Sequence, residues 1–171
     1  MSRVSKRYKL SKKEIKNFIK LINNIYNNFN LSKKDEIEYV KINNIEIYLI
    51  NNKPIFYKLS KEKLIPILLY LLKNRYEWLP RVIVDRGATR AVGRGADLMV
   101  PGIRALDEFN EGDVVVIVDE ETRVPVAVGI ALLSSEAIRE RLLGERKGKA
   151  IKTIHYPGDK VWEAAKLLEK S

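Results

Sequence analysis

The sequence contains no cysteine, which excludes disulfides, thiolate metal sites and cysteine nucleophiles. Its single histidine, His155, rules out a histidine-clustered metal site and argues against a Ser-His-Asp triad. Long apolar runs are also missing: the longest, Ile67–Leu72, is far shorter than the roughly 20 residues that span a bilayer. The N-terminus has no apolar signal core, so we expect a cytoplasmic protein without a membrane segment.

Charge and glycine are unevenly distributed along the chain. The 171 residues are 46% hydrophobic and 32% charged, which is typical of a folded protein, and the net charge is +10. Residues 1–80 hold 17 Lys and Arg against 7 Asp and Glu, whereas residues 81–171 hold 15 of each. All nine glycines lie between Gly87 and Gly158. The change of composition predicts two domains, 1–79 and 80–171, and the basic first half indicates an anionic partner.

The first half has the pattern of a small α+β domain. Ser11 and Glu14 form a capping-box motif, and apolar residues then recur at helical spacing from Ile15 to Phe29. The basic leader before this helix, Met1–Lys9, is expected to be either an ordered arm or a loose tail. From Ile37 to Tyr57 the period changes to two, with Asn-Asn breaks that predict a three-stranded meander. Pro66 predicts the first turn of a short buried helix.

The second half alternates short strands with glycine-bearing turns. Strands are expected at Val82–Val84, Val114–Val118, Val124–Leu133 and Lys149–His155. Ser134 is expected to cap a helix that ends near Leu143. Many short strands with few helices favour a small barrel or pseudobarrel.

Motifs of known catalytic or nucleotide sites are not found. The glycines at 87, 93 and 95 do not have the spacing of a phosphate loop or of a dinucleotide fingerprint. Asp85, Asp97 and Asp113 stand alone near turns, where an aspartate more often hydrogen-bonds its own backbone than performs catalysis. No cofactor or metal is therefore expected.

One segment has the composition of a phosphate-binding surface. Arg86, Arg90 and Arg94 recur every four residues and would share one face of a helix. Gly87 and Gly95 flank them, and a backbone without side chains can approach a sugar-phosphate chain closely. Three exposed arginines on a surface helix with no ligand are an equally good reading of this spacing alone.

The order of several motifs resembles a PUA domain, the RNA-binding module named after pseudouridine synthase and archaeosine transglycosylase. These motifs are Val84-Asp85-Arg86-Gly87-Ala88, Gly95–Ile103, Phe109-x-x-Gly112-Asp113, Ala127–Ala131 and Ile154-His155-Tyr156. The Pro-Gly-Ile, Ser-Ser-Glu and Ile-His-Tyr elements are similar to those of the branch that includes the malignant-T-cell-amplified protein, ligatin and archaeal counterparts, which carry a pre-PUA domain. The resemblance implies an α+β fold with a pre-PUA domain at 1–79 and a PUA β-pseudobarrel at 80–171.

The same resemblance implies where RNA would bind. By position, the RNA-binding residues would be Arg86, Gly87, Ala88, Arg90, Arg94, Gly95, Ala96 and, with weaker support, Arg104.

The function implied is that of a non-catalytic protein that binds structured RNA, such as tRNA or ribosomal RNA, in translation initiation, reinitiation or ribosome recycling. The small ribosomal subunit and a separate translation factor would be its partners, and the lysine-rich first domain would add attraction or a second contact. Two alternatives stay open: a module that docks an acidic protein without RNA, and an RNA-modifying enzyme that uses Asp85 or Asp97.

Overall fold

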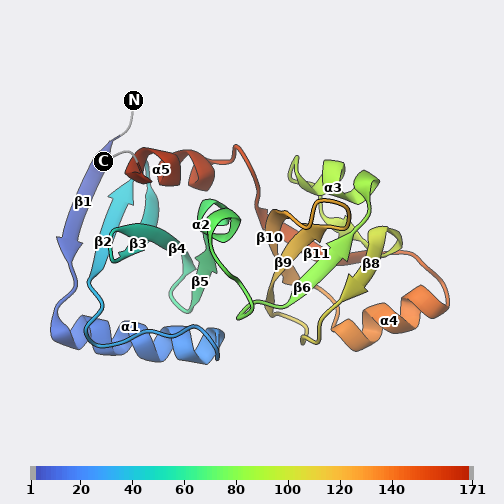
Figure 1. Cartoon of the computed structure of the whole chain (residues 1–171), viewed down its shortest axis with the longest axis horizontal. Helices are drawn as coiled ribbons and strands as arrows, with labels where there is room; N and C mark the ends of the chain where they lie inside the picture. Colours follow the sequence, from blue (N-terminus) through green and yellow to red (C-terminus); the bar gives the residue numbers. More distant parts are fainter. Residues whose placement is uncertain (1–2, 170–171) are drawn as a thin grey trace. The chain divides into compact units, whose positions relative to one another are not determined.

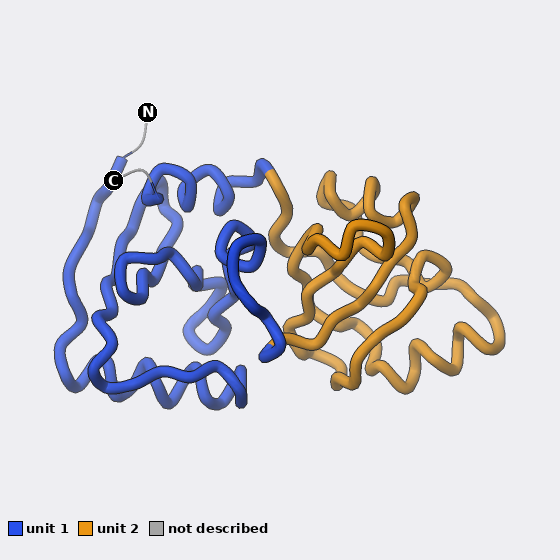
Figure 2. The backbone as a smooth tube through the Cα atoms, in the orientation of Figure 1, with its two compact units in different colours: residues 1–78, 158–171 blue, residues 79–157 orange. Residues whose placement is uncertain are grey.

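The computed structural model describes residues 3–169, which form two compact units (Figures 1 and 2). Unit 1 comprises residues 1–78 and 158–171, and unit 2 comprises residues 79–157. The elements of unit 1 are β1 (Val4–Lys9), α1 (Lys12–Ile25), β2 (Ile37–Ile42), β3 (Ile45–Ile50), β4 (Lys53–Ser60), β5 (Lys63–Pro66), α2 (Leu68–Lys73) and α5 (Lys160–Glu169). Those of unit 2 are β6 (Arg81–Val84), α3 (Arg86–Val92), β7 (Leu98–Met99), the 3-10 turn η1 (Val100–Gly102), β8 (Ile103–Leu106), β9 (Val114–Asp119), β10 (Pro125–Ala131), α4 (Ser135–Leu143) and β11 (Lys149–His155).

Helix α1 begins at the capping box that the sequence predicts. The Glu14 amide donates to Ser11 Oγ at 3.2 Å, and the Ser11 amide donates to Glu14 Oε1 at 2.9 Å. The helix ends at Ile25, because Tyr26 has extended backbone angles. Its apolar side carries the buried Phe18, whose ring centroid lies 4.8 Å from that of Tyr48 in β3.

Unit 1 contains an antiparallel sheet of order β1-β2-β3-β4-β5. The expected meander is confirmed as β2–β4, and its turns are made by Asn43-Asn44 and Asn51-Asn52, all four with positive φ. Asparagine tolerates this left-handed conformation better than most residues, so the Asn pairs fix the two hairpins. The structure adds two edge strands, β1 and β5. Residues Val4–Lys9 of the basic leader form β1, so this part of the leader is an ordered arm; Met1 and Ser2 lie outside the described residues.

The expectation for Pro66 is wrong in one respect. Pro66 is the last residue of β5 and pairs with Phe56, and the helix begins only at Leu68. Strand β5 is at the edge of the sheet, where a residue without an N–H costs no ladder hydrogen bond.

The predicted domain 80–171 must also be corrected at its C-terminal end, because α5 belongs to unit 1. Helix α5 contacts β3, β4 and α2, and it lies on the opposite side of the sheet from α1 (Figure 1). Its buried side chains form one stripe: Val161, Ala164, Ala165 and Leu168. An ion pair of 3.2 Å joins Glu169 to Lys73 of α2. Amphipathic periodicity predicts such a helix but not the sheet that covers its apolar side.

Unit 2 contains a six-stranded sheet of order β7-β11-β10-β9-β6-β8, in which only the β6–β9 pair is parallel. Its core is built from β-branched residues such as Val82, Val84 and Ile117, each fully buried. The strands expected in this half are confirmed, as is a helix capped by Ser134, whose Oγ accepts from the Ala137 amide. The α+β class is thus confirmed in both units. Within residues 3–169, no helix has the length and apolarity to cross a bilayer.

A buried carboxylate fixes α3 to the sheet. Asp119, at the end of β9, is only 7% exposed. Its Oδ1 accepts from Thr89 Oγ1 of α3 at 2.7 Å, and its Oδ2 accepts from the amide and the hydroxyl of Thr122 at 2.9 and 3.0 Å. The hydrogen bond from Thr89, together with those from Thr122, lowers the pKa of Asp119 from its ordinary value of 3.8 to about 2.

We predict that Gly129→Ala destabilises unit 2. A Cβ at this position in β10 would lie 2.5 Å from Ile151 Cγ2 and 2.7 Å from the Lys152 carbonyl oxygen, so β11 must move away. Such overpacking costs about 1–3 kcal/mol of unfolding free energy, measurable by urea denaturation. The control is Gly87→Ala, whose Cβ would meet no atom closer than 3.6 Å. Equal stability of the two variants would contradict the close approach of β10 and β11.

We also predict that Asp119 contributes to acid sensitivity. Its pKa is lower in the folded protein than in the unfolded chain, so its stabilising effect is complete above pH 4 and is lost as the pH falls to about 2. Asp119→Asn should be less stable than the parent at pH 7, and this difference should shrink between pH 4 and pH 2. Urea denaturation at a series of pH values measures it, and a difference that does not change with pH would be inconsistent with the hydrogen bonds described.

Candidate nucleic-acid interface

Helix α3 and the turn after it hold seven of the eight residues that the sequence assigns to RNA binding. Asp85 caps the helix: its Oδ1 accepts from the Ala88 amide at 2.8 Å. The helix stops at Val92, and Gly93 and Gly95 close the turn through bonds from their amides to Thr89 and Val92 carbonyls. Arg94 therefore lies past the helix, so the expectation that three arginines share one helical face is correct only for Arg86 and Arg90.

Two glycines allow other parts of unit 2 to approach this segment closely. A Cβ on Gly102 of η1 would lie 2.6 Å from Ala88 Cβ, so the missing side chain lets η1 touch α3. Gly95 has φ +98°, and a Cβ there would lie 2.8 Å from the ring of Tyr156. Ala96 is fixed beside it, since its carbonyl accepts from Thr153 Oγ1 at 2.8 Å. Gly95 thus has a packing role that is sufficient to explain it without a ligand.

Two of the four predicted arginines are engaged with acids of the same unit. Arg86 Nη2 lies 3.0 Å from Glu121 Oε2, and this hydrogen bond raises the pKa of the already basic Arg86. Arg104 of β8 lies between Asp85 and Glu120, at 3.4 and 3.6 Å. The acids that surround the first turn of α3 therefore offset much of its positive charge.

Arg90 and Arg94 differ from this pair. Both side chains belong to exposed residues, and neither forms an ion pair or a side-chain hydrogen bond within the described residues 3–169. They occupy the last turn of α3 and the turn that follows, beyond the carboxylates that engage Arg86 and Arg104. The C-terminal end of α3 thus presents two guanidinium groups without a carboxylate partner.

Gly87 has no structural requirement for a missing side chain. It is exposed, its φ is not in the left-handed region, and a Cβ would meet only Asp85 Oδ1 at 3.6 Å, an ordinary contact. In a helix, glycine is less favourable than alanine by up to about 1 kcal/mol. The fold alone does not account for glycine at this position.

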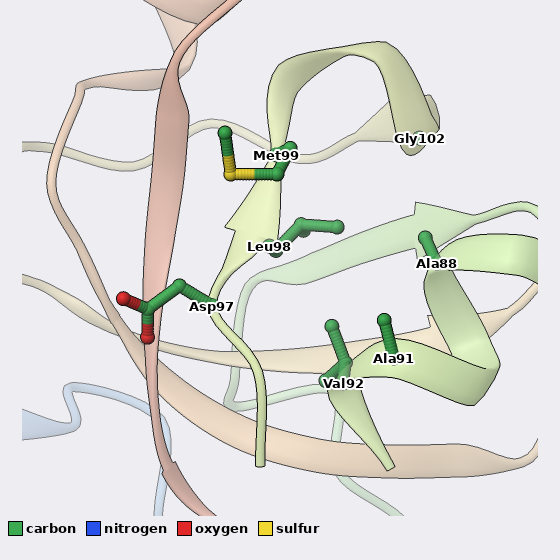
Figure 3. Close-up of a pocket in the computed structure, with 7 residues that line it drawn as sticks. All are labelled: Ala88, Ala91, Val92, Asp97, Leu98, Met99 and Gly102. Carbon is green, nitrogen blue, oxygen red and sulfur yellow. The ribbon is translucent and has the colours of Figure 1, made fainter. Parts of the chain in front are cut away.

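A pocket of about 180 Å³ lies beside these residues (Figure 3). Ala88, Ala91 and Val92 of α3 line one side, and Leu98 and Met99 of β7 with Gly102 line the other, as Figure 3 shows. The Met99 side chain is 44% exposed, so an apolar surface is open to solvent here. Asp97 is the one carboxylate among the lining residues.

The aspartates considered for catalysis are occupied by structural bonds. Asp97 Oδ1 accepts from the Thr153 amide at 3.1 Å, and its Oδ2 lies 3.3 Å from Lys149 Nζ. Asp85 caps α3 and faces Arg104, and Asp113 Oδ2 accepts from the Asn110 amide. His155 is fully buried. Across residues 3–169 there is no group of three or more His, Cys, Asp or Glu side chains placed to hold a metal ion.

The sequence pattern does not indicate the roles of Asp119, Thr89 and Tyr156 or the presence of the pocket. Asp119 ends a run of β-branched residues and precedes Thr122 by three residues. This spacing is typical of an aspartate that accepts a hydrogen bond from the backbone of a turn, so it could have indicated the bond to Thr122. No local signal indicates Tyr156, because its ring meets Gly95 from a distant part of the sequence.

Comparisons with known proteins agree with the two units. Residues 80–157 match the PUA domain family, and residues 6–74 match a domain of unknown function, DUF1947. An uncharacterized protein of Methanocaldococcus jannaschii is 41% identical over 93% of this chain and 96% of that protein. Translation machinery-associated protein 20 of Eremothecium gossypii is 33% identical, over 77% of this chain and 74% of that protein.

A solved structure is similar over nearly the whole chain. The crystal structure of a PUA domain protein from Aeropyrum pernix K1 superposes with a TM-score of 0.88 at 32% identity, covering 96% of this chain and 92% of that one. The chain therefore belongs to the PUA-domain proteins, with an N-terminal DUF1947 domain, and it is homologous to translation machinery-associated protein 20 and malignant T-cell-amplified sequence 1.

Proposed function

We propose that this chain is a non-catalytic RNA-binding protein of the translation machinery, and that the C-terminal end of α3 contacts a structured RNA. The relatives named for their association with translation, together with the PUA domain, support this function. The RNA is a tRNA or a ribosomal RNA, with the small ribosomal subunit and a separate translation factor as partners.

The observation that carries the proposal is the pair of unengaged guanidinium groups of Arg90 and Arg94. Elsewhere in unit 2, Arg81 and Arg139 lie 3.0 and 2.6 Å from Asp107 and Glu108. A guanidinium without a carboxylate partner is available for a phosphate, which it can bind through two parallel hydrogen bonds. The exposed backbone at Gly87 extends the same surface, since nothing there blocks a sugar-phosphate chain.

The pocket beside α3 supports RNA over a simple anion. A nucleotide combines an anionic phosphate with an apolar ring face, and here an apolar pocket lies beside a helix that ends in two free cations. An unpaired base would contact the apolar lining of the pocket, and other phosphates of the same RNA would contact Arg90 and Arg94. Helical RNA hides its base edges in a narrow major groove, so the remaining contacts would read shape and phosphates.

An acidic protein partner is the competing function, and it predicts a different salt dependence. Phosphate contacts release condensed counterions, and each contact adds about 0.7–0.9 to the slope of log affinity against log salt. A docking contact between two folded proteins has no comparable counterion atmosphere to release.

We predict that Arg90→Glu with Arg94→Glu weakens binding to a structured RNA by on the order of 10- to 100-fold at low salt, because two phosphate contacts become repulsive. The slope against salt should fall by about 1.4–1.8. Fluorescence anisotropy with a labelled tRNA and a labelled ribosomal RNA hairpin measures both.

The control for this variant is Lys33→Glu with Lys34→Glu, two exposed lysines of unit 1 without ion pairs in the described chain, which changes net charge equally. Equal losses in the two variants would show that net charge and not the α3 surface determines binding. Unchanged affinity in the arginine variant would remove α3 as the contact.

Gly87→Ala should separate stability from binding. Alanine should raise the unfolding free energy by up to about 1 kcal/mol, because glycine is the weaker helix former and no clash arises. The same variant should bind RNA several-fold more weakly, since the added methyl group occupies the approach of the sugar-phosphate chain. Thermal melts and anisotropy titrations test this, and stabilisation with full affinity would exclude backbone contact at Gly87.

A further inference from the structure

The outer face of α1 carries a row of lysines without counter-charges. Lys12, Lys16 and Lys20, which we call the lysine stripe, follow each other at i, i+4 and i+8, so they lie on one side of the helix. All three are exposed, and none forms an ion pair within residues 3–169. The one acid of the helix, Glu14, is engaged with the Ser11 amide in the capping box.

This arrangement is unfavourable for the helix itself. Like charges four residues apart repel each other, and Lys12 and Lys13 place positive charge at the positive end of the helix dipole. Half of the twelve basic side chains of unit 2 have a carboxylate nearby: Arg81, Arg86, Arg104, Arg139, Lys147 and Lys149 each lie within 4 Å of one. A local arrangement that weakens the element without a structural gain is expected at functional sites.

We propose that the lysine stripe binds the phosphate backbone of a double-stranded RNA segment. This inference rests on the proposal that the chain binds RNA, and it adds a contact site in unit 1 and the form of RNA that this site takes. The stripe is a straight row about 12 Å long, given the helical rise. Lysine serves as a point charge for phosphate, and the exposed Asn17, Asn23 and Asn24 of α1 are side chains that commonly contact phosphates and sugars.

Double-stranded RNA fits this face better than a single strand. Proteins that bind single strands stack the bases on aromatic side chains, whereas duplex RNA is recognised through shape and phosphate contacts. The aromatic residue of α1, Phe18, is buried against Tyr48 and Phe56 and is not available for stacking. A row of cations without aromatic residues therefore favours a duplex.

Other anionic partners fit less well. The apolar side of α1, with Phe18 and Ile22, is buried in unit 1, so the helix has no apolar face to insert into a membrane. Protein interfaces are depleted in lysine and enriched in aromatic residues and arginine, which the outer face of α1 does not carry.

The test compares two triple variants of the full chain. The first is Lys12→Gln, Lys16→Gln and Lys20→Gln; the control is Lys33→Gln, Lys34→Gln and Lys61→Gln, which removes three exposed, unpaired lysines of unit 1 outside α1. Glutamine has nearly the helix propensity of lysine, so α1 should be retained, and circular dichroism and thermal melts of both variants verify this. Probes are two blunt RNA hairpins of unrelated sequence, a single-stranded RNA of equal length, poly-glutamate and vesicles of anionic phospholipid.

We expect the stripe variant to lose on the order of 10- to 100-fold in affinity for both hairpins at low salt, with a salt slope smaller by about 2–3, and the control to lose several-fold at most. The loss for the single strand should be smaller. Equal losses in the two variants would overturn the proposal, as would a loss of binding to poly-glutamate or vesicles with hairpin binding unchanged.

The Arg90 and Arg94 variant separates this inference from the proposed function. Weaker RNA binding in that variant, with full binding in the stripe variant, would refute the stripe and leave the α3 surface intact. Full RNA binding in both variants would refute both.

Discussion

The hydrogen bond from Thr89 to Asp119 connects the single helix of the candidate interface to the sheet of unit 2. Helix α3 is only seven residues long, and an isolated helix of that length would not be stable in water. Its position is set by this bond, by the cap at Asp85 and by the contact of Ala88 with Gly102. The arginines at its end can present a defined surface only because these contacts hold the helix.

Charge pairing decides which of the basic residues are available. Unit 2 uses most of its carboxylates to hold basic side chains, and the acids around the start of α3 engage Arg86 and Arg104. The cations without a carboxylate partner include Arg90 and Arg94 at the other end of α3 and, in unit 1, the lysine stripe along α1. These two surfaces carry unpaired positive charge of the kind that a protein uses to bind a polyanion.

Local features of the fold could be predicted from the sequence, and long-range contacts could not. The Ser11 and Glu14 capping box and the two Asn-Asn turns each depend on residues within four positions of one another, so their patterns are visible directly. The docking of α5 on the sheet of unit 1 depends on contacts across most of the chain. Nothing local indicates which apolar surface covers its stripe.

The candidate site shows the same division. Arginine and glycine content identified the α3 segment, but the pairing of Arg86 with Glu121 joins residues 35 positions apart. The packing role of Gly95 against Tyr156 is likewise a tertiary contact. Spacing therefore indicates the candidate surface without showing which of its basic side chains lack a carboxylate partner.

Photo-crosslinking of the full chain to a structured RNA, followed by mass spectrometry of the crosslinked peptides, shows whether α3 contacts RNA. We expect RNA adducts on residues 86–99, which comprise α3, the turn after it and β7, whether or not adducts also form on the lysine stripe of α1. Adducts confined to α4 and the loop at 144–148, with none on residues 86–99, would contradict this expectation.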